Sequence, residues 1–209
     1  MGTRILNNNV ELIGKIISDP EYNHEVMGEK FYKVLLEVKR LSDTADTIPL
    51  IIPERLSVKE VLCIGTIVSV RGQFRSRNVH EETKTYLALF VFVQEILKID
   101  CSTHKGLNQI EFDGFICRES TYRTTPLGRE IADALIAVNR GYGKADYLPC
   151  ICWGRNARYV SELPIGAHMA LTGRIQSRNY TKRYPDGLEE ERTAYEVSVS
   201  RIEELDGKE

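Results

Sequence analysis

The chain has 209 residues, of which 42% are hydrophobic and 28% are charged, and its formal net charge is −2. This ordinary globular composition suits one large domain or two of about 100 residues, and it excludes a protein that attracts nucleic acid over its whole surface. Neither a signal peptide at Met1 to Asn9 nor an apolar run of roughly 20 residues is present, so we expect a soluble, cytoplasmic protein.

The first half of the chain has the pattern of five strands and one short helix. Alternating or β-branched apolar runs predict strands at 10–16, 31–40, 48–52, 66–76 and 85–96, with a helix-compatible segment at 55–61. Gly72 lies in the middle of the fourth strand, where a glycine indicates a bulge or a sharp bend.

The second half repeats the first at a nearly constant shift of 100 or 101 residues. Matching pairs include Asn8 and Asn108, Asp46 and Asp146, Gly72 and Gly173, and Ser76-Arg77-Asn78 and Ser177-Arg178-Asn179. The repeat predicts strands at 110–116, 132–140, 148–153, 167–177 and 193–202, with a short helix at 156–163. We infer a tandem duplication whose boundary lies in the polar stretch 100–105, giving domains 1–104 and 105–209.

Each half therefore has three strands, a short helix and two further strands. This is the order of the OB-fold, a five-stranded Greek-key barrel. We expect an all-β protein with short helices, built from two tandem OB-folds. An SH3-like barrel or a small β-sandwich is the alternative, and the helix before the fourth strand favours the OB-fold.

The third strand of the second half carries two aromatic residues of the same parity. Tyr147 and Trp153 are six residues apart, so a regular strand directs both to one face, while Leu148, Cys150 and Cys152 point to the core. The outer face of strands 2 and 3 is the usual oligonucleotide platform of an OB-fold, and rings there stack unpaired bases. The alternative for Trp153 is a position in the core.

The fourth strand of the second half is basic. Arg174 and Arg178 share one face by parity, and Tyr180 follows at the start of a long loop that ends near Glu191. Basic residues with an inserted aromatic ring are typical of a surface that follows a nucleic-acid backbone and stacks a base. The alternatives are a solvated strand face for the arginines and a hairpin cap for Tyr180. For Tyr142, between two glycines, the alternative is an ordinary turn tyrosine.

Three blocks of the second half resemble bacterial single-stranded DNA-binding proteins. The blocks are 123–140, 146–157 and 173–178, and the resemblance extends over about Leu107 to Glu203. It implies an OB-fold that stacks DNA bases at four aromatic positions, which fall on Tyr142, Tyr147, Trp153 and Tyr180. We expect the phosphates to be neutralised by Arg140, Arg174, Arg178 and Lys182.

The first half lacks these rings. Thr47, Pro53 and Val79 stand at the positions of Tyr147, Trp153 and Tyr180, although Arg40, Arg75 and Arg77 remain. We therefore expect a degenerate copy that supports assembly or only guides the strand. Family members commonly assemble four OB-folds, so the resemblance implies a homodimer.

The end of the chain departs from the family pattern. The family usually ends in an acidic tail with a Pro-Phe-type tip that recruits other DNA-processing proteins, whereas Glu203 to Glu209 is short and has no aromatic tip. We therefore count replication or repair proteins as possible partners without a recognisable acidic Pro-Phe tail to recruit them. The expected function is to coat and protect single-stranded DNA during replication, recombination or repair, in association with the nucleoid.

No enzyme, cofactor or metal site is expected. The histidines at 24, 80, 104 and 168 form no ligand or triad pattern, and the run Gly141 to Lys144 is not a phosphate loop. The five cysteines suggest neither a disulfide framework nor a zinc site, and we expect reduced, buried thiols. A protein-interaction scaffold of tandem OB barrels and an RNA-binding OB protein are the alternative functions.

Overall fold

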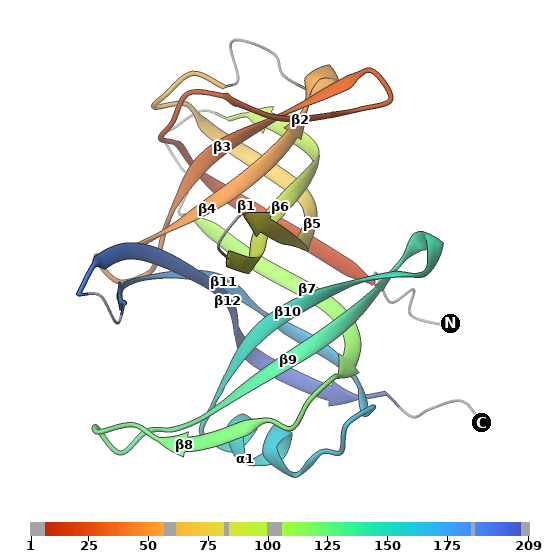
Figure 1. Ribbon diagram of the computed structural model, residues 1–209, viewed down its shortest axis with the longest axis vertical. Helices are drawn as coiled ribbons and strands as arrows, with labels where there is room; N and C mark the ends of the chain where they lie inside the picture. Colours follow the sequence, from red (N-terminus) through yellow and green to blue (C-terminus); the bar gives the residue numbers. More distant parts are fainter. Residues whose placement is uncertain (1–6, 57–61, 82–83, 100–105, 185–186, 206–209) are drawn as a thin grey trace.

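Two five-stranded barrels lie side by side and share one continuous sheet (Figure 1). The computed structural model describes residues 7–56, 62–81, 84–99, 106–184 and 187–205. The first barrel consists of β1 (Asn8–Ile16), β3 (Glu29–Lys39), β4 (Ala45–Pro53), β5 (Ile67–Glu81) and β6 (Lys84–Lys98). The second consists of β7 (Leu107–Ile116), β9 (Glu130–Arg140), β10 (Lys144–Trp153), β11 (His168–Arg183) and β12 (Glu189–Glu204).

The strand pairing of both barrels is that of an OB-fold. In each barrel the first strand pairs with the second and the fourth barrel strand, and the third pairs in parallel with the fifth. These pairings close a five-stranded barrel of Greek-key connectivity. The expectation of an all-β protein with two tandem OB-folds is confirmed.

Two short strands are not predicted by the sequence pattern. β2 (Glu21–Val26) pairs with β3, and β8 (Thr121–Thr124) pairs with β9, so that each forms a hairpin arm outside its barrel. β8 is exposed along its whole length and no residue of β2 is buried. Strands without a buried face lack the apolar alternation from which strands are predicted.

The helix expected in the second barrel is confirmed as α1 (Arg155–Glu162). In the first barrel the corresponding place begins with a 3-10 turn, η1 (Glu54–Leu56), and residues 57–61 of the expected helix lie outside the described residues. The expected domain boundary at 100–105 and the chain end at 206–209 also lie outside them, as do Cys101 and His104. No helix in the described part of the chain is long and apolar enough to cross a membrane.

The two mid-strand glycines mark bulges, as expected. The pairing of β5 with β6 shifts register between Arg71 and Gly72, and that of β11 with β12 shifts between Thr172 and Gly173. A Cβ atom at Gly173 would lie 2.4 Å from the carbonyl oxygen of Ser198. The backbones thus approach more closely than any side chain would permit, and the bulge lets a long strand bend around the barrel.

β1 and β7 join the barrels by antiparallel pairing, and the join is symmetric. Val10 lies opposite Ile110, its own equivalent in the repeat, and Asn8 and Leu12 lie opposite Phe112 and Asn108. Exchanging the two halves of the chain therefore turns each of the residue pairs on one side of Val10–Ile110 into the corresponding pair on the other side. An approximate two-fold axis passes through this pair and relates the two halves of the chain.

The repeated asparagines extend the strand pairing of their own barrels. The side chain of Asn8 donates to the carbonyl oxygen of Phe74 at 2.7 Å and accepts from its N–H at 3.0 Å. Asn108 does the same with Ile175, at 2.7 and 2.9 Å. Each asparagine thus satisfies the backbone of the bent fourth strand beyond the last residue pair of the β ladder.

Aliphatic side chains fill both barrels. The largest fully buried ones include Leu12, Leu36, Ile48, Leu50, Ile110, Ile136 and Leu148. Cys150 and Cys152 are also buried, and burial raises the pKa of the Cys152 thiol to about 12. The expectation of buried thiols is confirmed for these two, whereas Cys63 is exposed and Cys117 is half-buried.

Candidate nucleic-acid interface

The outer face of β10 presents the two expected rings to solvent. Tyr147 and Trp153 are 42% and 38% exposed, while Leu148, Cys150 and Cys152 between them are buried. The parity argument is therefore confirmed, and Trp153 is not a core residue. Two half-exposed rings on one face of a barrel strand form a surface on which unpaired bases can stack.

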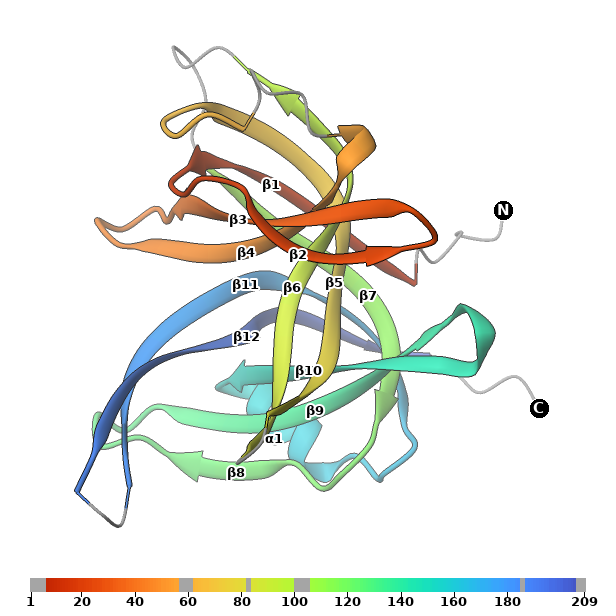
Figure 2. The same ribbon diagram turned by 45° about the horizontal axis from the view of Figure 1, so that its top comes forward.

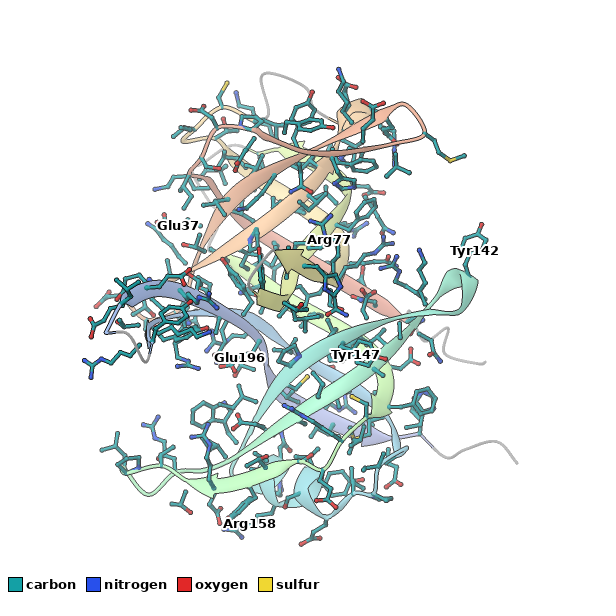
Figure 3. All side chains as sticks on the ribbon, viewed as in Figure 1. Glu37, Arg77, Tyr142, Tyr147, Arg158 and Glu196 are labelled. Carbon is teal, nitrogen blue, oxygen red and sulfur yellow. The ribbon has the colours of Figure 1, made fainter. Side chains whose placement is uncertain are left out.

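Tyr142 stands at the tip of the turn η2 (Gly141–Gly143) that joins β9 to β10, and its side chain is fully exposed (Figure 3). Its backbone is left-handed, with φ 62° and ψ 35°. A non-glycine residue in this region costs about 1–2 kcal/mol. Its position, fully exposed at the tip of a turn, fits both an ordinary turn tyrosine and a ring that stacks a base.

Tyr180 lies on a strand and not at the start of a loop, so the expected long loop ending near Glu191 is wrong. β11 continues to Arg183 and pairs with β12, and Tyr180 lies opposite Arg192. Polar residues occupy both strands of this hairpin, so the alternation that identifies a strand is missing. The Tyr180 ring is 37% exposed, and the Arg178 guanidinium lies 5.9 Å from its centroid.

The four basic residues of the expected site differ in how far their charge is already paired. Arg140 donates to Asp146 at 3.2 Å, and Arg174 donates to Asp46 at 3.3 Å. Arg178 is exposed, and no described carboxylate lies within ion-pair distance of it. The Lys182 ammonium lies 4.8 Å from the Tyr184 ring centroid. Arg178 and Lys182 therefore offer the charge that a phosphate can use most directly.

Two symmetric groups of hydrogen bonds, here called locks, join the two barrels. The N–H of Ser177 in the second barrel donates to Asp46 of the first at 2.8 Å, and the Thr47 N–H donates to the Ser177 hydroxyl at 2.9 Å. In the symmetric lock, the Ser76 N–H donates to Asp146 at 2.8 Å. Both carboxylates are almost completely buried.

The second lock also positions the candidate platform. The N–H of Tyr147 donates to the Ser76 hydroxyl at 2.7 Å, which fixes the backbone beneath the ring. Figure 2 shows the β5–β6 hairpin of the first barrel running across the second barrel, where this contact forms. The repeat revealed both serines and both aspartates, but it did not indicate that each pair bridges the two barrels.

These features define an OB-fold protein with an exposed aromatic face of the kind that binds oligonucleotides. Residues 107–205 match the model of the Single-strand binding protein family. The match spans the second barrel only, and it confirms there the resemblance that the sequence blocks indicated.

Known proteins of the same description are similar to part of the chain. The chain is 37% identical over 81 residues to Single-stranded DNA-binding protein 1 of Staphylococcus aureus, covering 35% of this chain and 48% of that protein. It is 35% identical over 81 residues to Single-stranded DNA-binding protein A of Bacillus subtilis, covering 35% and 47%. The chain thus spans about half the length of the curated relatives that it matches.

One solved structure is similar over both barrels. The wild-type single-stranded DNA binding protein from Thermus aquaticus aligns with a TM-score of 0.79 and 20% sequence identity, covering 97% of this chain and 94% of that one. This likeness extends the shared fold to the first barrel, which the family model does not reach.

Proposed function

We propose that the chain binds single-stranded DNA without enzymatic activity and protects it during replication, recombination or repair. The observation that carries the proposal is the exposed pair Tyr147 and Trp153 on one face of β10, with Tyr142 held at the adjacent turn. Base-stacking rings discriminate little between bases because every base has a π-face, so we expect weak sequence preference.

The strand is expected to run over the second barrel with bases on Tyr142, Tyr147, Trp153 and Tyr180. Arg178 and Lys182 then neutralise phosphates, while Arg140 and Arg174 contribute less because Asp146 and Asp46 share their charge. Affinity should fall by about 0.7 log units per phosphate contact for each log unit of salt. Such local binding is compatible with a net charge of −2.

The proposal includes assembly as a homodimer in association with the nucleoid. One chain already supplies two barrels related by an approximate two-fold axis, so two chains give the four OB-folds common in the family. Light scattering of the purified protein tests this part of the proposal. A mass equal to one chain at all concentrations would contradict it.

Fluorescence titration with oligo-dT at two salt concentrations tests the binding itself. Trp153 is the only tryptophan, so its emission reports one position. Strong quenching that reverses with salt is expected, because a base stacks on or near this ring. No quenching, together with no mobility shift, would instead favour an interaction scaffold. An RNA oligomer of the same sequence, added as competitor, separates a preference for DNA from a preference for RNA.

A further inference from the structure

A groove lies between the two barrels and is lined by residues from both. The first barrel contributes Arg75 and Arg77 from β5 and Phe90 and Phe92 from β6, and the second contributes Arg140 and Lys144. Its volume is about 440 Å³, within the range of sites that hold small ligands. No residue of the expected site other than Arg140 belongs to it.

Positive charge in this groove exceeds negative charge. Arg75 donates to the neutral side chain of Gln73 at 2.6 Å, and burial and then the charge of Arg140 lower its pKa. Arg77 and Lys144 are exposed, and no carboxylate in the described part of the chain lies within ion-pair distance of either. Asp146 is the nearby carboxylate, and it already accepts from Arg140 and Ser76. An anion would therefore relieve repulsion among these cations.

The aromatic residues of the groove lie on a different strand from those of the second barrel. The third and fifth strands of each barrel pair in parallel, and this pairing places Leu50 opposite Val91 in the first barrel and Cys150 opposite Val197 in the second. Val91 and Val197 are therefore equivalent positions. Their neighbours Phe90 and Phe92 in the first barrel correspond to Glu196 and Ser198 in the second. The first barrel thus lacks rings on its third strand but carries them on its fifth.

These rings support a second kind of stacking surface. The Arg75 guanidinium lies 4.3 Å from the Phe92 ring centroid, with Phe31 packed on the same ring at 5.9 Å. A guanidinium plane held in this way can itself stack an unpaired base. The groove therefore combines the two features of a single-strand site, cations and a flat π-surface.

The groove continues directly from the candidate platform of the second barrel. Arg140 and Lys144 flank the turn that carries Tyr142, and Ser76, which bonds the Tyr147 backbone, lies between Arg75 and Arg77 in the chain. Figure 3 shows Arg77 in the region between the barrels, on the side where Tyr142 and Tyr147 are labelled. The groove therefore adjoins the end of the candidate platform at which Tyr142 and Tyr147 lie.

We propose that this groove holds the sugar-phosphate backbone of a single strand as it passes from the second barrel onto the first, with Arg77 and Lys144 on phosphates and Arg75 against a base. The inference rests on the proposed function and extends it, because it makes the first barrel a part of the binding path. The composite site exists only where the two barrels meet.

The test compares two oligo-dT lengths with two double variants of the full chain. An OB-fold occupies about 4–16 nucleotides, so an oligomer of about 10 covers one barrel and one of about 30 reaches both. The variant Arg77→Gln/Lys144→Gln removes two exposed groove charges. The control Arg71→Gln/Lys98→Gln removes the same charge from the opposite end of the β5–β6 hairpin.

The groove variant is expected to bind the long oligomer about fivefold or more weakly, with a salt slope smaller by about 1.4, while the short oligomer changes by less than about twofold. The control should bind both lengths as the unmodified chain does. Equal losses in both double variants, or no loss with the long oligomer, would overturn the groove while leaving the proposed function intact. If the unmodified chain binds neither oligomer, the proposed function fails and the groove with it.

Discussion

The Asp46 carboxylate of the first barrel accepts the N–H of Ser177 from the second at 2.8 Å, and the repeat-related Asp146 accepts the N–H of Ser76 from the first at the same distance. Each half of the duplication therefore holds the other through the same two residue types. The β1–β7 pairing adds a continuous sheet to these contacts. The two barrels are consequently joined both by backbone pairing and by buried side-chain contacts.

The two locks are unequal, and their difference predicts unequal stability effects. The Oδ2 atom of Asp46 accepts from Arg40 and Arg174, whereas Oδ2 of Asp146 is buried without a partner among the described residues. We expect Asp46→Asn to lower the free energy of unfolding by about 1–2 kcal/mol more than Asp146→Asn does. Urea denaturation measures both, with Asp43→Asn in the exposed loop as a control. If both variants lose the same free energy of unfolding, the arginine contacts of Asp46 contribute nothing to stability.

Trp153→Ala should weaken binding of oligo-dT by about 1–3 kcal/mol, because one stacked base loses its ring. The fold should remain intact because the side chain is partly exposed. The matched control is Tyr159→Ala on α1, which removes a ring of the same 38% exposure from outside the expected path. Filter binding or calorimetry gives both affinities. Unchanged affinity in the folded Trp153 variant would remove this ring from the site.

Tyr142→Asn should separate binding from stability. Asparagine tolerates the left-handed backbone better than tyrosine, so the free energy of unfolding should stay equal or rise by about 0.5–1 kcal/mol. Binding should weaken by about 1–3 kcal/mol because the exposed ring is lost. Urea denaturation and an oligo-dT titration on the same sample provide the two readouts. A clear loss of stability would show that the ring serves the fold.

The buried thiols predict a dependence of stability on pH. The pKa of Cys152 is about 12 in the folded chain against an ordinary value of 9.0, and burial also raises that of Cys150. A thiol whose pKa is higher in the folded chain than in the unfolded chain contributes stability that is fully present below the unfolded pKa. This contribution is lost as the pH rises through the folded pKa. Stability should therefore fall between about pH 9 and 12.

Cys152→Ala should flatten this decline relative to the unmodified chain in urea denaturation at several pH values. A thiol reagent at pH 8 should label Cys150 and Cys152 only after unfolding, since both are buried. Exposed Cys63 is the internal control for reagent activity. Rapid labelling of the two buried thiols in the folded chain would contradict the stated cause of the shift.

Most of the fold followed from periodicity and from the repeat. The alternation in β10 placed Tyr147 and Trp153 on one face, because side chains on a strand alternate between its two sides. Gly72 and Gly173 marked bulges because only a residue without Cβ fits there. The sequence predicts neither the arms β2 and β8 nor the hairpin beyond Tyr180, since exposed strands have no apolar face to reveal them.

By itself, the sequence determined the two barrels, the aromatic face of the second and the loss of that face in the first, because these depend on local patterns along a strand. The tertiary structure alone decided that Ser76 and Ser177 each reach the opposite barrel, that Arg140 and Arg174 are paired with buried carboxylates, and that a basic groove lies between the halves. The physical reason is that these contacts depend on how the two barrels dock through β1 and β7, and residues brought together in this way leave no periodic pattern along the chain.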